Sequence, residues 1–498
     1  MDLVTLLEMI AAGGADRVLV GRLDDGLTGT DLRSRACSGA EYLAEIGAEK
    51  LIYLAGNQPA FAVALFSAAA AHRPFLPLNY RLSDEQLGEI LQRHDGLIVT
   101  DALDRVAALA PDRATIGIDD FMARTAQAPH GGPIPADVED IAVLLMTSGT
   151  TAAPKSAVLR HHHLTSYVIG SVEFSGADPH DATIVSVPPY HIAAVANLLS
   201  NLYAGRRIVY LDQFTPRQWL DVVKAEAITN AMVVPTMLSR IVDELDLSGE
   251  VGPPTLRNVS YGGAKVSAKV IEAALRLFPT TGFVNAYGLT ETSSSIAVLG
   301  PEDHRAAQSS SDPAVRARLG SVGRALDGVE IEIRNADGER CGQGEVGEIM
   351  VKGPQVAGEY LEKGSLLAGD GWFPTRDQGY LDADGYLFVR GRADDTIIRG
   401  GENIAPAEIE EVLSRHDAVR ECVVAGVPDD EWGHRIAAYI TLKDGCAPSA
   451  DEIRDFVRAR LRSSKTPDIV EFLDELPTTP TGKIVRRDLV ARTTKSLV

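Results

Sequence analysis

The segment Leu145–Ala157, with the sequence L-M-T-S-G-T-T-A-A-P-K-S-A, is the most informative part of this chain. The apolar run 141–146 is typical of a buried strand, and the small polar residues after it predict a tight loop. That loop combines several hydroxyl side chains with Gly149 and Lys155. Hydroxyls, backbone N–H groups and a cation are the partners that a polyphosphate needs, so the segment predicts a phosphate-binding loop.

The loop is not the P-loop of nucleoside triphosphatases. The spacing from Gly149 to Lys155 nearly fits that motif, but Pro154 stands where its second glycine is needed. Proline has no N–H to donate and cannot adopt a positive φ, which excludes the P-loop interpretation. From the loop alone, a plain hydroxyl-rich turn after a core strand stays open as the alternative.

The composition predicts an acidic protein with several subdomains. A chain of 498 residues is too long for a single hydrophobic core, and 45% apolar residues are enough to build several. The 48 basic and 69 acidic residues give a net charge of −21, which disfavours nucleic acid and anionic membranes as partners. To bind an anionic polyphosphate, such a protein must gather positive charge locally or use a divalent cation.

The cysteines and the N-terminus favour a cytoplasmic location. The four cysteines lie far apart without a C-x-x-C pair, so neither a zinc site nor a disulfide framework is expected. The N-terminus M-D-L-V-T-L-L-E lacks the basic region of a signal peptide, and no apolar run is long enough to span a bilayer. The run His161–His163 is expected to be a solvated helix start rather than a metal site, since adjacent helical side chains diverge.

The order of apolar patterns predicts an α/β fold. Short apolar runs alternate with segments of helical spacing from residue 1 to about 140, and again from 184 to 286, which is typical of parallel sheets covered by helices. Alternating residues and hairpin-type turns make the part from about 324 to 392 β-rich, as a small barrel or distorted sheet. The last hundred or so residues have an α+β pattern.

Two polar stretches follow predicted strands, where α/β proteins bind ligands. In the stretch 261–264, the glycines would let a flat ring lie against the backbone, although an ordinary strand-to-helix turn explains them equally well. In the stretch 285–292, Tyr287 can stack on a base, Thr290 can contact a phosphate, and Glu291 can bind Mg²⁺ through oxygen. Read alone, Glu291 is also explained as a charge at a helix N-terminus.

Two later features add to this set. Asp377 and Arg392 together could hold a ribose, because the carboxylate can accept hydrogen bonds from both ribose hydroxyls. The plain alternative is that Asp377 is a turn residue and Arg392 a surface cation. Lys483 lies in a Thr/Pro/Gly-rich stretch near the C-terminus, and an exposed loop lysine by itself indicates no function.

Together these stretches resemble the motifs of the adenylate-forming superfamily, which contains acyl-CoA synthetases, luciferases and the adenylation domains of peptide synthetases. The motif T-S-G-T-T-x-x-P-K at 147–155 is the most specific, and the others follow in the superfamily's order over essentially the whole chain. The resemblance implies an α/β fold with two flavodoxin-like subdomains and a small β-barrel, followed by a mobile α+β C-terminal domain. The implied bounds are 1–392 for the N-terminal domain (about 1–165, 166–320 and 321–392), 393–395 for the hinge and 396–498 for the C-terminal domain.

The resemblance also implies a role for each candidate residue. The phosphate loop would comprise Thr147, Ser148, Gly149, Thr150, Thr151 and Lys155. Gly262, Gly263, Ala264 and Tyr287 would border the adenine, Asp377 and Arg392 the ribose, and Thr290 the α-phosphate, with Glu291 on Mg²⁺. Lys483 would bridge the carboxylate and the α-phosphate, His191 would line the acyl pocket, Asp394 would be the hinge, and Gly400 and Gly401 would line the pantetheine tunnel.

The implied activity is ligation of a carboxylic acid to CoA, with ATP and Mg²⁺, through an acyl-adenylate. The string G-G-E-N-I-A-P-A-E-I-E at 400–410 resembles fatty-acyl and aryl-CoA ligases, and the apolar residues after His191 favour a hydrophobic acid. The sequence identifies neither the acid nor the thiol acceptor, CoA or a carrier protein, and leaves a homodimer open.

Two expected glycines are replaced, by Ala152 and Ser156. If position 152 needs positive φ, alanine costs about 1 kcal/mol or more there. One alternative is therefore a ligase with weak or absent adenylation that makes the thioester from a supplied acyl-adenylate. A second is a non-catalytic binder of acyl-adenylates.

Overall fold

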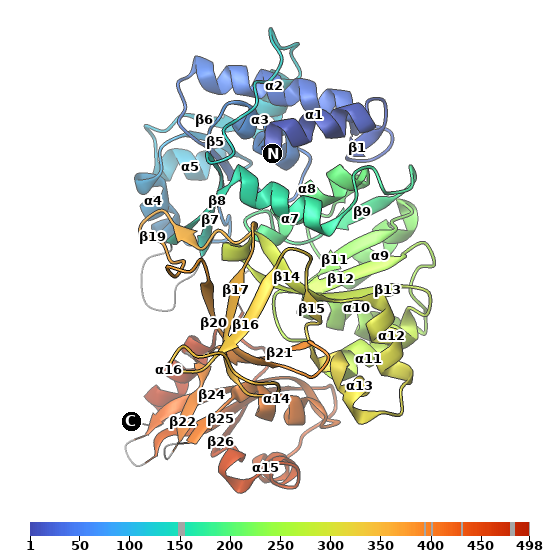
Figure 1. Cartoon of the computed structure of the whole chain (residues 1–498), viewed down its shortest axis with the longest axis vertical. Coiled ribbons are helices and arrows are strands. Elements are labelled where there is room, and N and C mark those ends of the chain that lie inside the picture. Colours follow the sequence, from blue (N-terminus) through green and yellow to red (C-terminus); the bar gives the residue numbers. More distant parts are fainter. Residues whose placement is uncertain (148–154, 393–394, 400–401, 430–431, 479–483, 498) are drawn as a thin grey trace.

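The computed structural model describes residues 1–147, 155–392, 395–399, 402–429, 432–478 and 484–497. Its larger part is built on two sheets with helices around them, and a smaller α+β part at the C-terminus lies at the other end of the molecule (Figure 1). In the described part, no helix combines the length and the apolar character that crossing a membrane requires. The domain bounds predicted from the sequence stay predictions.

The first sheet has eight strands in the order β19-β18-β8-β7-β4-β3-β5-β6. Its strands are β3 (Leu51–Leu54), β4 (Phe75–Pro77), β5 (Leu97–Thr100), β6 (Thr115–Gly117), β7 (Ile141–Thr147), β8 (Lys155–Arg160), β18 (Glu359–Tyr360) and β19 (Gly364–Ser365). The strands from β7 to β6 along this order are parallel, whereas β8, β18 and β19 extend the sheet in antiparallel pairs. The predicted phosphate loop joins β7 and β8, where the parallel part of the sheet meets the antiparallel part.

The second sheet has nine strands in the order β15-β14-β13-β12-β11-β9-β10-β1-β2. They are β1 (Val18–Val20), β2 (Leu27–Thr28), β9 (Ala182–Val185), β10 (Arg207–Tyr210), β11 (Asn230–Val233), β12 (Asn258–Gly262), β13 (Gly282–Leu289), β14 (Ser294–Leu299) and β15 (Arg324–Ala325). The sheets exchange strands along the chain, because β1 and β2 join the second sheet while β18 and β19 join the first.

Helices connect and cover both sheets, as the alternating pattern predicts. They are α1 (Leu3–Gly13), α2 (Gly29–Glu45), α3 (Ala60–Ala70), α4 (Asp84–Arg93), α5 (Leu103–Leu109), α6 (Ile118–Thr125), α7 (His161–Ser171), α8 (Ile192–Ala204), α9 (Pro216–Ala225), α10 (Pro235–Ser248), α11 (Ala268–Leu277), α12 (Pro301–Ser309) and α13 (Pro313–Ala317). Side-chain caps begin several of them; Ser83, for example, accepts the N–H of Gln86 in a capping box at the start of α4.

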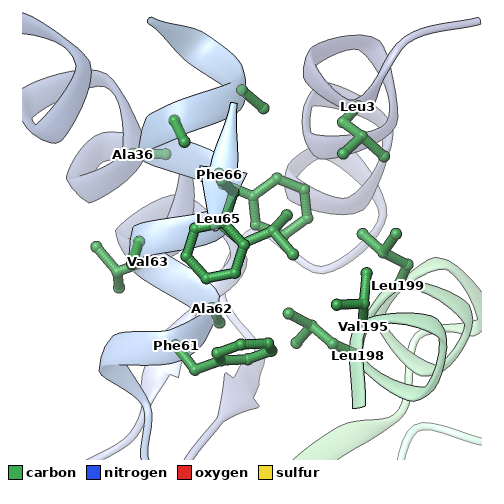
Figure 2. Packing of buried hydrophobic residues seen from close by; sticks show 14 of the residues in the cluster. Leu3, Ala36, Phe61, Ala62, Val63, Leu65, Phe66, Val195, Leu198 and Leu199 are labelled. Atoms are coloured by element: carbon green, nitrogen blue, oxygen red, sulfur yellow. The ribbon is translucent and has the colours of Figure 1, made fainter. Parts of the chain in front are cut away.

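The largest apolar core lies where helices of the two sheets meet. Helix α3 is apolar on all sides and almost wholly buried, which is typical of a helix inside a large domain. Figure 2 shows Phe61 and Leu65 of α3 on the side that faces α8, with Leu198 and Leu199 of α8 opposite. This contact fixes the two sheets relative to each other, and so the edges that carry the candidate site.

The β-rich part is a four-stranded antiparallel sheet and not the barrel that the resemblance implied. Its strands, β16 (Glu330–Arg334), β17 (Gly347–Lys352), β20 (Phe373–Leu381) and β21 (Leu387–Arg392), pair in that order, and within the described residues the order ends at β16 and β21 without closing. The physical reason is that β14 covers its apolar face: Ile296 and Ala297 pack against Val351 and Leu387.

The C-terminal part packs helices on both faces of a small sheet. Strands β24 (Val419–Asp429), β25 (Gly433–Leu442) and β26 (Ile469–Phe472) form this sheet, preceded by the hairpin β22 (Ile397–Arg399) and β23 (Glu402–Ile404). Helices α14 (Pro406–Ser414) and α15 (Ala450–Arg458) share one apolar cluster, and Leu489 of α16 (Arg486–Leu497) belongs to a second one with Tyr439. The α+β pattern expected from the sequence is thus confirmed.

The prediction that His161–His163 are solvated is wrong for two of the three residues. The histidines do begin α7, but His161 and His163 are buried, and only His162 is partly exposed. His161 lies under the N-terminus of the chain, where its Nδ1 accepts the N–H of Leu3 at 3.2 Å. Burial lowers the pKa of His161 to about 4, so this ring is neutral at pH 7.

Candidate active site

The predicted phosphate loop connects β7 to β8, an antiparallel pair inside the first sheet, with β18 on the other side of β8. Thr147 and Lys155 are partners in that pair, and Oγ1 of Thr147 donates to the carbonyl of Lys155 at 3.4 Å. The loop residues Ser148, Gly149, Thr150 and Thr151, together with Ala152, lie outside the described residues. The structure therefore describes the two ends of the loop, Thr147 at the end of β7 and Lys155 at the start of β8.

Positive charge gathers at the end of the loop although the protein is acidic. Partial desolvation and the positive charges of Lys363 and Arg376 lower the pKa of Lys155. Its Nζ lies 5.7 Å from the centre of the Tyr360 ring, within the range of a cation–π contact. Arg376 has φ +63°, which L side chains adopt rarely, and such strain is often retained at functional sites. These three cations could attract phosphates, although the carboxylate of Glu362 also acts on Lys155 and offsets part of their charge.

Glu291 lies at the end of β13, in the short 3₁₀ turn Thr290–Thr292. The segment before β18 holds this turn, because the N–H groups of Ala357 and Gly358 donate to the carbonyl of Glu291 at 2.9 and 3.0 Å. The hydroxyl of Tyr360 donates to Oε1 of Glu291 and also interacts with the side chain of Thr147. Burial and the Glu291 charge raise the pKa of Tyr360, which keeps the hydroxyl protonated as a donor.

Asp377 and Arg392, predicted to act together, are in contact. They are partners in the β20–β21 ladder, and Nε of Arg392 lies 3.1 Å from Oδ1 of Asp377. The hydroxyl of Tyr287 donates to Oδ2 of the same carboxylate at 2.7 Å. Burial and the charge of Asp377 raise the pKa of Tyr287 well above its usual value. Tyr287 of β13, Asp377 of β20 and Arg392 of β21 are thus joined by a hydrogen bond and an ion pair.

This group and the Glu291 group are neighbours, because Arg392 acts electrostatically on the hydroxyls of both Tyr287 and Tyr360. The structure brings together Thr147, Lys155, Glu291, Tyr287, Asp377 and Arg392, with Thr290 beside Glu291. An array of one buried carboxylate, one partly exposed carboxylate and several cations can bind a nucleotide and a divalent cation.

Glycine is required at position 262 and favoured at position 263 for two different physical reasons. A Cβ at Gly262 would lie 2.2 Å from the carbonyl oxygen of Ala286 on the next strand, so a side chain would separate β12 from β13. Gly263 has φ +87°, and a Cβ there would meet no atom within 4 Å. Gly263 and Ala264 are exposed, so this loop offers an open backbone surface beside Tyr287.

His191 is the N-terminal flanking residue of α8 and is half-buried. Its ring centre lies 5.0 Å from that of Tyr190, and Tyr190 packs edge-to-face with Tyr80 at 5.6 Å. The following residues Ile192 and Ala193 pack against the main apolar core. The surroundings of His191 are therefore aromatic and apolar, and its role at the acyl pocket stays a prediction.

The other predicted residues lie outside the described residues: Lys483, the hinge residue Asp394, and Gly400 and Gly401. Two further residues of this region were not predicted from the sequence. Tyr360 contacts Glu291 and Lys155, and Glu362 accepts the hydroxyl of Ser156, which stands where the family motif has glycine. The two residues lie some two hundred positions after the phosphate loop, and no local pattern marks either of them.

Comparison with known families identifies the class of protein. The family model of AMP-binding enzymes matches residues 7–361, and the model of the AMP-binding enzyme C-terminal domain matches residues 408–483. The chain belongs to the AMP-binding enzyme family, the adenylate-forming enzymes that the sequence motifs resemble.

Individual relatives are similar along most of the chain. A fatty acid–[acyl-carrier-protein] ligase of Streptomyces coeruleorubidus is 32% identical over 89% of this chain and 86% of its own length. A feruloyl-CoA synthase of an Amycolatopsis species is 33% identical over 94% of both chains. The structure of o-succinylbenzoate CoA synthetase from Bacillus subtilis, in complex with its acyl-adenylate intermediate, superimposes with a TM-score of 0.84 at 29% identity over 97% of both chains.

Proposed function

We propose that this protein is an acid–thiol ligase that uses ATP and Mg²⁺ to convert a hydrophobic carboxylic acid into an acyl-adenylate and then transfers the acyl group to CoA. The observation that carries the proposal is the connected group of Lys155, Glu291, Tyr287, Asp377 and Arg392 in a member of the AMP-binding family. The named relatives, which ligate aryl or fatty acids, support the same reaction class.

The residues present fit a magnesium nucleotide. Glu291 offers carboxylate oxygens, the ligand type that Mg²⁺ prefers, and the cations around Lys155 suit phosphates. In the proposal, Thr147 and Lys155 bind the β- and γ-phosphates with the rest of the loop, and Thr290 contacts the α-phosphate. Bound Mg²⁺ would supply Lewis-acid stabilisation of charge on the phosphoryl oxygens.

Asp377 and Arg392 would hold the ribose, since a carboxylate accepts hydrogen bonds from hydroxyl groups and the guanidinium beside it can donate hydrogen bonds. The open backbone at Gly262, Gly263 and Ala264 would border the adenine, with Tyr287 against it. Lys483 is proposed to bridge the acid and the α-phosphate, and Gly400 and Gly401 to line the thiol tunnel after a rotation about Asp394.

The proposed acid is hydrophobic, and aromatic or medium-to-long-chain acids are the first substrates to test. The aromatic contacts of His191 and Tyr190 and the apolar start of α8 support this choice. The comparisons give no support to the two alternatives raised by the replaced glycines, so neither is proposed. A cytoplasmic location and a homodimer stay predictions from the sequence.

The test is release of AMP and pyrophosphate from ATP and Mg²⁺ with a panel of hydrophobic acids, with CoA, with an acyl-carrier protein or without acceptor. Pre-made acyl-adenylates with CoA are assayed in parallel. Acid-dependent pyrophosphate release with formation of acyl-CoA supports the proposal. Thioester formed only from the supplied adenylates, with no pyrophosphate from any acid, would contradict the adenylation half of it.

A further inference from the structure

Tyr360 occupies the centre of the contacts between the phosphate loop and Glu291. Its hydroxyl donates to Oε1 of Glu291 and interacts with Thr147, while its ring lies beside the ammonium group of Lys155. One side chain therefore contacts both ends of the phosphate loop and the carboxylate that is proposed to bind Mg²⁺.

The strand that carries Tyr360 is attached to β8 by several bonds. Tyr360 pairs with Ala157, and the N–H of Leu361 donates to the carbonyl of Ser156 at 2.9 Å. One residue before Tyr360, Glu359 forms a two-pronged ion pair with Arg160, with Nη2 2.8 Å from Oε1 and Nε 3.2 Å from Oε2. The backbone around Tyr360 is thus fixed on the same strand that begins with Lys155.

Ser156, at a position where the family motif has glycine, adds a contact that glycine cannot make. That contact is from Oγ, which donates to Oε1 of Glu362 at 2.9 Å. The backbone N–H, which glycine would also offer, donates to Oε2 at 3.0 Å. Ser156 is completely buried, so its hydroxyl points away from solvent and toward the hairpin that follows Tyr360. The serine side chain therefore adds a hydrogen bond between β8 and Glu362, two positions after Tyr360.

Taken together, these contacts have a chemical consequence for Glu291. The hydrogen bond from Tyr360 engages Oε1 and sets the orientation of the carboxylate. Residues that orient a metal ligand in this way typically contribute roughly a factor of 10 to 100 to metal affinity or activity. The ion pair Glu359–Arg160 and the contact Ser156–Glu362 lie on either side of Tyr360 and restrict its movement.

We propose that Tyr360 is a positioning residue that orients the carboxylate of Glu291 toward Mg²⁺, and that the contact between Ser156 and Glu362 holds Tyr360 in place. The inference rests on the proposed function, in which Glu291 binds Mg²⁺. It assigns a role to the serine that departs from the family motif, and to two residues that no sequence motif of this chain singles out.

The main variant is Tyr360→Phe, which keeps the ring beside Lys155 and removes only the hydroxyl. Binding of a non-hydrolysable ATP analogue is measured by calorimetry over a range of Mg²⁺ concentrations. The Mg²⁺ concentration for half-maximal binding is expected to rise roughly 10- to 100-fold. Binding of the analogue without Mg²⁺ is expected to stay unchanged, because the cations at the phosphate loop are intact.

The matched control is Tyr386→Phe. Tyr386 also donates to a carboxylate, Oδ1 of Asp303 at 2.6 Å, and it lies outside the candidate site. Removal of this hydroxyl is expected to leave the Mg²⁺ dependence at the wild-type value. A general loss of stability would lower the thermal midpoint of both variants, whereas the positioning role predicts a change in Mg²⁺ dependence for Tyr360→Phe only.

The second set of variants tests the contact that holds Tyr360. Glu362→Ala and Ser156→Gly are expected to shift the Mg²⁺ dependence in the same direction as Tyr360→Phe, by a smaller factor because the backbone bonds of Leu361 remain. Glu362→Gln keeps an acceptor for the Ser156 hydroxyl and is expected to stay close to the wild type.

Two outcomes would overturn the inference in distinguishable ways. If the wild type binds the analogue equally well with and without Mg²⁺, the Mg²⁺ role of Glu291 in the proposed function is wrong, and the positioning role is wrong with it. If the wild type depends on Mg²⁺ and Tyr360→Phe shows the same dependence, only the positioning role is wrong. If Tyr360→Phe shifts the Mg²⁺ dependence while Glu362→Ala and Ser156→Gly keep the wild-type dependence, the contact between Ser156 and Glu362 does not hold Tyr360 in place.

Discussion

Asp377 and Arg392 face each other across the antiparallel pair β20–β21, with Nε of Arg392 3.1 Å from Oδ1 of Asp377. The hydroxyl of Tyr287, on the second sheet, donates a hydrogen bond of 2.7 Å to Oδ2 of Asp377. The buried carboxylate thus connects the β-rich part to the sheet that carries Glu291. A ligand bound there would contact elements of both parts.

Replacement of Asp377 by Asn should weaken use of ATP. The amide keeps the shape but loses the charge that holds Arg392, and a hydrogen bond to a charged group contributes about 1.5–3 kcal/mol. We expect kcat/KM for ATP to fall by roughly 10- to 150-fold. The exposed Asp384→Asn, in the turn between the same strands, serves as control. An unchanged kcat/KM for Asp377→Asn would exclude a ribose-binding role.

Replacement of Lys155, at the end of the phosphate loop, should lower the rate of pyrophosphate release more than replacement of a lysine outside the candidate site. Lys155→Ala removes the cation that is proposed to bind the phosphate oxygens, and loss of one such donor typically costs about a hundred- to a thousand-fold in rate. Pyrophosphate release with a saturating acid measures the loss. Lys352→Ala is the control, because Lys352 donates to the carbonyl of Asp370 on an exposed edge. Equal rates in both variants would refute the phosphate role.

Lys483→Ala should separate the two half-reactions. We expect a roughly hundred- to thousand-fold loss in pyrophosphate release from free acid and ATP, since the lysine is proposed to stabilise the adenylation transition state. Thioester formation from a supplied acyl-adenylate and CoA should stay within a few-fold of the wild type. A parallel loss in both assays would mean that the lysine has no role specific to adenylation.

The stability of the fold should fall between pH 6.5 and about 4 because of His161. Its pKa is lowered from 6.5 to about 4 by burial, so below pH 6.5 the unfolded chain binds a proton that the folded ring resists. Stability is therefore retained above pH 6.5 and lost progressively toward pH 4, by about 3 kcal/mol from this group.

The measurement is the free energy of unfolding in denaturant at several pH values. The variant His161→Gln should have a shallower dependence on pH, although His163, whose pKa burial also lowers, would leave part of the slope. The highly exposed His130→Gln is the control and should follow the wild type. Parallel curves for all three proteins would show that His161 does not contribute.

Local patterns predicted the elements of the site well. The strand before the phosphate loop and the hairpin turns of the β-rich part follow from hydrophobic alternation and turn residues. The pairing of Asp377 with Arg392 was also within reach, because both lie on adjacent strands of one hairpin and their register follows from the turn.

Contacts between distant segments were not predictable from local patterns. The barrel expected from the family resemblance is an open sheet because β14, from another sheet, covers its apolar face. His161 and His163 looked polar and solvated, yet the N-terminal helix and the core bury them. In each case the deciding partner lies far away in the chain.

The sequence by itself determined the α/β character, the order of the ligand-binding motifs and the residue types at each of them, because these depend on periodicity and short spacing. Only the tertiary structure decided that Tyr360 meets Glu291, 69 residues away, and that Ser156 binds Glu362, 206 residues away. The physical reason is that a hydrogen bond depends on distance and direction in space, which the packing of the two sheets sets and sequence spacing does not.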